Sequence, residues 1–295
     1  MKDNIVKKAL NKILERKLAA ERKYETQTKS LYSNPNFVNL EKEYTRTMIE
    51  NARKESLGET VDKSLEHKLH QQIKEYKNSI NVGEVEYSCP LCKDTGYLNG
   101  DRCKCLNQEI SRLLLENSGF DELEDFEKAQ FSDNTTKAFY KKMQQWCDSS
   151  FSKNLILIAG EVGVGKTHLA KCMAKTLIEK GKVVKIVTAL NLNQDMKEFS
   201  KRNDETILNN YLDIEILFID DLGTEPLYKN VTEQFLYLII NERKMKKLPT
   251  IITTNLDLDD IRNRYDERIY SRIGDKKTSI NYFLSGQDFR LKNRK

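Results

Sequence analysis

The first 80 residues carry apolar side chains at helical spacing, within a background rich in Lys and Glu. One face of a predicted helix is lined by apolar residues three or four positions apart, namely Leu65, Leu69, Ile73, Tyr76 and Ile80. A shorter stripe near the start of the chain consists of Ile5, Leu10, Ile13, Leu14 and Leu18. Asn34-Pro35-Asn36 lies between the two stripes and interrupts the helices. We therefore expect residues 1–80 to be helical, either as a small bundle or as a docking region for a protein partner.

From about Leu123 onward the pattern changes to short apolar runs that alternate with amphipathic stretches. Five runs have the length and composition of buried strands, namely Leu155–Ala159, Val183–Thr188, Glu215–Ile219, Thr250–Thr254 and Ser279–Leu284. The stretches between them include Thr167–Lys180 and Val231–Lys247, which are long enough to be helices. Strands that alternate with helices form parallel sheets through βαβ crossovers. The sequence therefore predicts an α/β domain with a five-stranded parallel sheet over residues 116–295.

The segment after the first of these strands matches a phosphate-binding loop. Its residues fit G-x-x-x-x-G-K-[ST] without a mismatch, and they are Gly160, Glu161, Val162, Gly163, Val164, Gly165, Lys166 and Thr167. In such a loop, successive backbone N–H groups surround phosphate oxygens at the N-terminus of a helix. We expect Lys166 to reach the β- and γ-phosphates and Thr167 to ligate Mg²⁺. His168 directly follows the loop and belongs to the predicted nucleotide-binding segment. We expect it to have a structural role rather than to act as a base.

Two acids end the third predicted strand, at the sheet edge where the phosphates would lie. An apolar strand of this kind places the Asp220 and Asp221 carboxylates beside the phosphate-binding loop. We expect Asp220 to hold the Mg²⁺ shell and Asp221 to polarise the attacking water, which is the usual division in phosphoryl transfer. Acids at a strand end can also be simple helix caps, but the loop upstream favours the catalytic interpretation.

Further polar candidates follow the fourth strand. Asn255 ends the run Thr250–Thr254, where it could orient the lytic water or sense the γ-phosphate. Arg268 and Arg272 are four residues apart and so share one helix face. One of them is well placed to act as an arginine finger, and a surface ion pair with a neighbouring acid is the alternative for each.

Four of the six cysteines fall within seventeen residues, namely Cys89, Cys92, Cys103 and Cys105. Four thiolates suit tetrahedral Zn²⁺, although the C-x-C spacing of the second pair is tighter than the usual C-x-x-C. The pattern predicts a structural zinc module over residues 81–115, with no open coordination position for catalysis. His67 and His70 are alternative ligands that we interpret as solvated helix residues. Cys147 and Cys172 are isolated and expected to be buried.

Composition and charge argue against membrane-spanning and secreted proteins. No apolar run approaches the ~20 residues that span a bilayer, and the charged N-terminus has no signal-peptide core. We therefore expect a cytoplasmic protein without membrane association. The net charge is +5, yet residues 241–295 carry 14 Lys or Arg against 8 Asp or Glu. A basic C-terminal part suggests contact with nucleic acid phosphates, the alternative being a solvated basic surface.

The order of these motifs resembles the AAA+ ATPases, in the branch that contains the initiator protein DnaA and the helicase loaders. As in that branch, the chain contains in order a strand, GEVGVGKT, FIDD, TTN and ERIYSRI. The segments GVGKTHLA, LFIDDLG and TTNLDLDDI are similar to those of bacterial replicative-helicase loaders of the DnaC/DnaI type, and CPLCKDTGYLNGDRCKCL supports the likeness. The resemblance extends from Phe126 to the C-terminus, whereas the first 80 residues match no motif.

The resemblance implies an AAA+ P-loop domain with the loop and acid roles given above. It also implies a first sensor at Asn255 and an arginine finger at Arg272, with Arg268 beside it. The second acid, Asp221, stands where most AAA+ enzymes have Glu, which leaves the rate of hydrolysis open. Arg290 could serve as a second sensor, but we expect no lid domain of the kind that larger AAA+ proteins have.

Residues 191–211 lie between the second and third predicted strands, where this branch has an extra helix that lines a channel for single-stranded DNA. Lys197, Lys201 and Arg202 would contact the phosphates. Phe199 and Tyr211 are the aromatic residues at hand for base stacking. An ordinary solvated helix is the alternative.

The function that the resemblance implies is ATP-dependent loading of the replicative hexameric (DnaB-type) DNA helicase onto single-stranded DNA in replication initiation. ATP, Mg²⁺ and Zn²⁺ are the implied cofactors, and copies of the chain would associate through the AAA+ domain. The helical region and zinc module would hold the helicase. Two alternatives stay open. One is a transposition ATPase of the IstB type, which normally lacks the four-cysteine module, and the other is a nucleotide-gated adaptor with little turnover.

Overall fold

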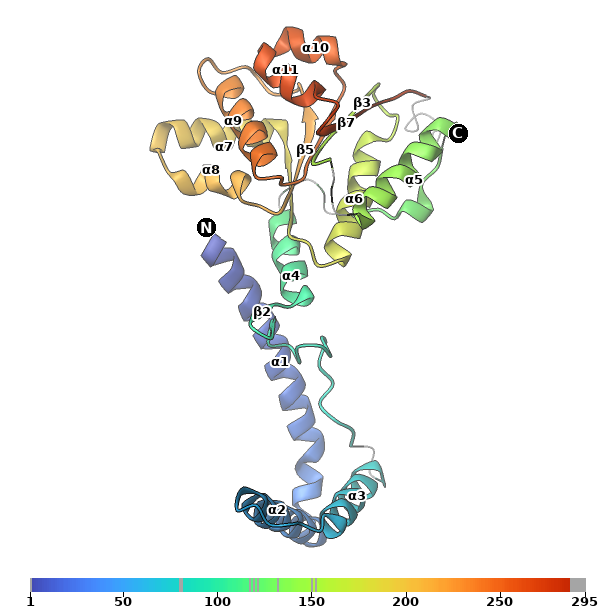
Figure 1. The fold of residues 1–295 in the computed structure, drawn as a ribbon, viewed down its shortest axis with the longest axis vertical. Helices are drawn as coiled ribbons and strands as arrows, with labels where there is room; N and C mark the ends of the chain where they lie inside the picture. Colours follow the sequence, from blue (N-terminus) through green and yellow to red (C-terminus); the bar gives the residue numbers. More distant parts are fainter. Residues whose placement is uncertain are drawn as a thin grey trace. The chain divides into compact units, whose positions relative to one another are not determined.

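The computed structural model describes residues 2–79, 82–116, 118, 120, 122–131, 133–149, 151 and 153–286. The chain forms two compact units, one of residues 11–98 and one of residues 1–10 together with 99–295. Figure 1 shows the fold and labels the helices α1 to α11 and some of the strands. Among the described helices, none is long and apolar enough to cross a membrane.

Three helices supply most of the 11–98 unit, namely α1 (Lys2–Tyr32), α2 (Pro35–Ser56) and α3 (Ser64–Ser79). The predicted interruption before Pro35 is confirmed. Pro35 is the first residue of α2, and the Asn34 side chain caps this helix by accepting a hydrogen bond from the Asn36 N–H at 2.9 Å. Helices α2 and α3 pack against each other, and the buried core consists of Leu31, Phe37, Ile73 and Val82.

Only part of each predicted apolar stripe is buried in this unit. On α3, Leu69 and Ile73 are buried, whereas Leu65 in the first turn is 49% exposed. On α1, Ile13 is buried while Leu14 and Leu18 are exposed. Ile80, the last member of the α3 stripe, lies outside the described residues. The core is small because each helix turns only a narrow face inward.

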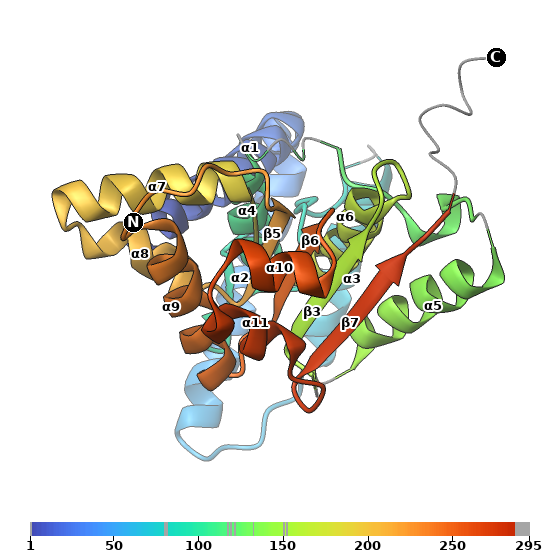
Figure 2. The ribbon, with the colours of Figure 1, turned by 90° about the horizontal axis from the view of Figure 1, so that it is seen from above.

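The second unit is built on a five-stranded parallel sheet, which confirms the predicted fold class (Figure 2). Its strands are β3 (Leu155–Gly160), β4 (Val184–Thr188), β5 (Ile216–Leu222), β6 (Thr250–Thr254) and β7 (Ser279–Leu284). They lie in the order β4-β5-β6-β3-β7, and every neighbouring pair is parallel. The carboxyl ends of all five strands therefore meet at one edge, with β3 between β6 and β7.

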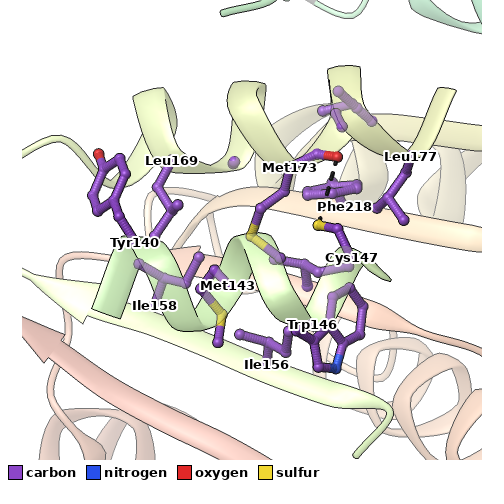
Figure 3. Close-up of a cluster of buried hydrophobic side chains, with 14 of the residues drawn as sticks. Tyr140, Met143, Trp146, Cys147, Ile156, Ile158, Leu169, Met173, Leu177 and Phe218 are labelled. Atoms are coloured by element: carbon purple, nitrogen blue, oxygen red, sulfur yellow. Dashed lines mark hydrogen bonds between the residues drawn. The ribbon is translucent and has the colours of Figure 1, made fainter. Parts of the chain in front are cut away.

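Helices cover both faces of this sheet. Ile156 and Ile158 of β3 pack against α5 (Asn134–Asp148) and α6 (Lys166–Glu179), as Figure 3 shows. Leu155 and Leu157 alternate with them and point to the opposite face. That face is covered by α7 (Ala189–Arg202), α8 (Glu205–Leu212), α9 (Thr232–Met245), α10 (Leu258–Arg264) and α11 (Glu267–Gly274). Burial on both faces explains why β3 and the first four residues of β5 are continuous apolar runs in the sequence.

Smaller elements precede the sheet. Strands β1 (Tyr97–Leu98) and β2 (Asp101–Arg102) form a short two-stranded sheet between the two cysteine pairs. The helix α4 (Lys104–Leu115) follows them, and a single 3-10 turn, η1 (Phe126–Lys128), precedes α5.

Helix α4 packs beside the edge strand β4. The Ser111 hydroxyl donates to the Lys182 carbonyl oxygen (3.1 Å) and accepts from the Val184 N–H (3.0 Å). The Asn107 side-chain amide donates to the Gly181 carbonyl oxygen at 2.9 Å. Side chains of α4 thus satisfy backbone groups at the start of β4, so this helix packs with the sheet although the sequence assigned it to the zinc module.

Candidate nucleotide-binding site

The predicted phosphate-binding loop lies at the carboxyl end of β3 and leads into α6. Gly160, Gly163 and Gly165 have φ angles of 150°, 81° and 97°, in a region that glycine enters more readily than any other residue. Space at Gly160 is restricted as well, because a Cβ atom there would stand 2.1 Å from the carbonyl oxygen of Leu284 on β7. The three glycines therefore make this loop conformation possible.

The first two residues of α6 carry the polar groups expected of such a loop. The Lys166 side chain is buried, and its Nζ donates to the carbonyl oxygens of Gly160 (2.9 Å) and Glu161 (2.6 Å). The Thr167 hydroxyl donates to Oδ1 of Asp220 at 3.3 Å. The ammonium group thus lies within the loop, and the hydroxyl lies beside an acid.

The two predicted acids lie at the end of β5. Asp220 is buried, and its Oδ1 also accepts a hydrogen bond from the Thr253 hydroxyl at 2.5 Å. Burial raises the pKa of Asp220 above its usual range. Asp221 has a φ angle of 55°, and its N–H donates to the same Thr253 hydroxyl at 2.9 Å. A hydroxyl and a carboxylate are the hard oxygen ligands that Mg²⁺ prefers, so Thr167 and Asp220 fit the predicted metal.

One pocket, with a volume of about 260 Å³, is lined by most of the predicted residues. Its lining consists of Val162, Gly163, Gly165, Lys166, Thr167, His168, Asp221 and Asn255. The structure thus brings the loop, the second acid and the predicted sensor together.

Tyr140 of α5 contacts both the phosphate-binding loop and the histidine that follows it. Its hydroxyl donates to the Gly165 carbonyl oxygen at 3.0 Å and lies 3.3 Å from Nδ1 of His168. Nδ1 of His168 also lies 3.7 Å from the sulfur of Cys172. Burial lowers the pKa of His168.

Both arginines of α11 lie outside this pocket. Nε of Arg272 donates to the Asn241 side-chain oxygen (2.9 Å), and its Nη2 donates to the Tyr237 hydroxyl (3.0 Å). Arg268 forms an ion pair with Asp266 at 2.6 Å. Both guanidinium groups lie near the ring of Tyr237, with their Cζ atoms 4.8 and 4.9 Å from its centroid. Arg272 lines a separate groove between α9 and α11.

Of the two aromatic residues on the α7–α8 segment, Tyr211 is not available for base stacking. The Tyr211 side chain is 1% exposed and its hydroxyl donates to Asp195, so it cannot stack on a base. Phe199 packs edge to face on Phe235 with ring centroids 5.1 Å apart. The stacking part of the prediction is therefore wrong for Tyr211. The Lys197 ammonium nitrogen lies 4.1 Å from the ring centroid of Tyr228, a residue that follows β5 in the sequence.

The other two predicted phosphate contacts of this segment lie near the end of α7. Lys201 and Arg202 are exposed, and Arg202 forms an ion pair with Glu198 at 2.7 Å. Cationic side chains thus remain accessible on α7.

The four clustered cysteines converge. The sulfur atoms of Cys89, Cys92, Cys103 and Cys105 all lie within 4.8 Å of one another. Tetrahedral Zn²⁺ with bonds of about 2.3 Å would place sulfur atoms about 3.8 Å apart, so this set fits the predicted metal. Asp94 holds the first pair, because its carboxylate accepts from the Ser88 and Cys89 N–H groups at 2.7 and 2.9 Å.

Among the described residues, His67 and His70 do not join this group and are exposed. Cys147 and Cys172 are buried as predicted. Arg290, the candidate second sensor, lies outside the described residues.

Two residues of the site escaped the sequence analysis. Thr253 contacts both acids, but the sequence does not distinguish it from Thr250 and Thr254 in the same fully buried strand. Tyr140 precedes Gly165 by 25 residues, and no local pattern marks it.

Residues 107–294 match the family model described as IstB-like ATP binding protein. The Escherichia coli (strain K12) protein named replicative helicase loader DnaC is 30% identical over 122 residues, which cover 40% of this chain and 49% of DnaC. The Bacillus subtilis (strain 168) protein named replicative helicase loader DnaI is 24% identical over 248 residues, which cover 74% of this chain and 75% of DnaI. The chain thus spans about half the length of DnaC.

A solved structure titled crystal structure of the DnaC helicase loader is also similar. It matches with a TM-score of 0.48 and 23% sequence identity, over 55% of this chain and 96% of that chain.

Proposed function

This chain belongs to the IstB-like ATP-binding protein family, and from that premise we propose that it is an ATP-dependent loader of a replicative hexameric helicase. The observation that carries the proposal is the pocket formed by the phosphate-binding loop, Asp221 and Asn255. It occurs in a chain whose curated relatives are named replicative helicase loaders.

The residues of the pocket have distinct roles in this proposal. Bound ATP supplies the phosphoryl group to be cleaved, and Mg²⁺ supplies the charge that neutralises it. Lys166 leaves its carbonyl partners to contact the β- and γ-phosphates, and Thr167 and Asp220 hold the metal. Asp221 polarises the attacking water, while Asn255 at the pocket rim orients it.

Arg272 acts on the pocket of a neighbouring copy. It lies outside the pocket of its own chain and lines the groove between α9 and α11. A contact between copies through this groove would carry the guanidinium group to the neighbour's γ-phosphate. Tyr237 and Asn241 would hold the group until then, and Arg268 would stay paired with Asp266.

The four cysteines bind one Zn²⁺, and with the helical region of residues 1–80 they hold the helicase. The cationic residues Lys197, Lys201 and Arg202 contact the backbone of single-stranded DNA. Nucleotide state would then shift the population of helicase-bound and released forms through differential contacts.

An IstB-type transposition ATPase is the main alternative, since the matching family model is described as IstB-like ATP binding protein. The four converging cysteines favour the loader, because an IstB-type protein normally lacks this module. A nucleotide-gated adaptor with little turnover is the second alternative, and steady-state phosphate release separates it from an ATPase.

The test uses the full chain and the DnaB-type helicase encoded in the same genome. With ATP, we expect the two proteins to elute together and the helicase to be deposited on circular single-stranded DNA. The Lys166→Ala variant is the control and should fail to deposit helicase. Absence of any complex with the helicase, with or without ATP, would overturn the proposed function.

A further inference from the structure

Strand β5 contains a bulge at the two acids. Ile219 pairs with Ile252 and Leu222 pairs with Thr254, so Asp220 and Asp221 together face the single residue Thr253. Bulges are rare between parallel strands, and they occur preferentially next to active sites. We therefore interpret the bulge as a part of the nucleotide site and not as a random irregularity in the sheet.

The bulge changes where the two carboxylates point. Neighbouring residues of a regular strand point to opposite faces of the sheet. Here Asp221 takes the left-handed conformation, with a φ angle of 55°, which Asp and Asn tolerate better than most residues. Asp221 consequently lines the phosphate pocket while Asp220 stays buried beside Thr167.

A single hydroxyl contacts both acids. The Thr253 oxygen accepts from the Asp221 N–H at 2.9 Å, and its hydrogen goes to Oδ1 of Asp220 at 2.5 Å. A backbone N–H can only donate, so it takes a lone pair of the hydroxyl and directs the hydroxyl hydrogen toward the carboxylate. The Thr253 side chain is 1% exposed, which leaves little room for water to replace either bond.

We propose that Thr253 is a positioning residue of the nucleotide site. Its hydroxyl orients Asp220 toward Thr167, where the metal would be held, and it fixes Asp221 in the bulge that faces the pocket. This inference rests on the metal and water roles proposed for the two acids.

The experiment compares Thr253→Val, which keeps the shape of the side chain and removes the hydroxyl, with Thr253→Ser, which keeps the hydroxyl. Thr254→Val is the matched control. Thr254 is equally buried on the same strand, and its hydroxyl donates to the Leu222 carbonyl oxygen (2.6 Å) without touching an acid. Thr253→Ala removes the same hydroxyl with less steric demand, in case Thr253→Val does not fold.

The main readout is the affinity for Mn²⁺, measured by electron paramagnetic resonance with a non-hydrolysable ATP analogue bound. Loss of a partner of a metal ligand typically weakens metal binding by roughly 10–100-fold, which is the change expected for Thr253→Val. Analogue binding without metal should be unchanged in this variant, while its kcat falls. Thr253→Ser should restore the Mn²⁺ affinity, and Thr254→Val should lower the melting temperature without changing that affinity.

Parental Mn²⁺ affinity in both Thr253→Val and Thr253→Ala would overturn the inference, as would equal weakening in Thr254→Val. A parent chain that binds analogue and Mn²⁺ but hydrolyses no ATP would contradict the proposed enzyme activity alone. The metal readout would still decide the role of Thr253 in that case. A parent chain that binds no nucleotide would overturn both.

Discussion

Replacing Gly160 by Ala should destabilise the sheet-containing unit and displace the phosphate-binding loop. The added Cβ would stand 2.1 Å from the Leu284 carbonyl oxygen and 3.0 Å from its carbonyl carbon. Both obstacles are backbone atoms of the neighbouring strand β7, so no side-chain rotation relieves them. The φ angle of 150° adds backbone strain. Strain at one residue costs about 1–3 kcal/mol and overpacking a further ~1–3 kcal/mol, which gives a loss of about 2–6 kcal/mol.

That loss is large against the ~5–15 kcal/mol by which a typical protein is stable. The chain has one tryptophan, Trp146, which is buried in the cluster that contains Ile156 and Ile158 of β3 (Figure 3). Its fluorescence during urea unfolding therefore reports on this unit alone. Nucleotide affinity measured below the unfolding transition reports separately on the loop.

Gly274→Ala is the matched control, because nothing lies within 4 Å of a Cβ built there and its φ angle is ordinary. We expect this control to be neutral or more stable by about 0.4–1 kcal/mol, since alanine restricts the unfolded chain. A Gly160→Ala protein with the urea midpoint and nucleotide affinity of the control would show that our account of the β3–β7 contact is wrong.

Three further predictions concern the metal, the subunit contact and a buried cation. We expect metal analysis to find one Zn²⁺ in the parent chain, and Cys103→Ser should lose this metal while keeping ATP binding; a parent chain that holds no zinc when purified without chelator would end the claim. Arg272→Ala should bind ATP normally and lose roughly 10³–10⁵ in turnover, the effect of an arginine finger in GTPases. Mixing it with Lys166→Ala should restore activity in mixed assemblies, whereas normal turnover by Arg272→Ala alone would favour a local structural role. Arg243→Met should lower stability by at least about 3 kcal/mol in urea unfolding, because the buried carbonyl oxygens of Tyr211, Ile214 and Pro249 would lose their donor at ~1–3 kcal/mol each, and a change below 1 kcal/mol would contradict that role.

Arg243 also illustrates what the sequence could not predict. It was counted among the basic residues that suggested a nucleic acid contact, yet its side chain is fully buried. The guanidinium donates to the carbonyl oxygens of Tyr211, Ile214 and Pro249 and to the Thr250 hydroxyl, at 2.6 to 2.9 Å. Burial lowers its pKa to about 9. Three chain segments converge on one cation here, and no local pattern encodes such a convergence.

The strands and the phosphate-binding loop were predictable because their signals are local. Strands buried on both faces are continuous apolar runs, and the loop needs glycines at fixed positions. The bulge at Asp221 was not predictable, since it depends on the register between β5 and β6. The same holds for Tyr211, an aromatic residue of a polar stretch that the fold turns inward.

The contact between α4 and β4 has a practical consequence for the design of shorter fragments of this chain. A fragment that starts at residue 116, the predicted domain boundary, would lack both Asn107 and Ser111. The Val184 N–H and the carbonyl oxygens of Gly181 and Lys182 would then lose the partners that α4 provides. An uncovered edge strand pairs readily with the same edge of another molecule. We expect such a fragment to self-associate through the start of this edge, so a fragment that contains the sheet should begin before Lys104.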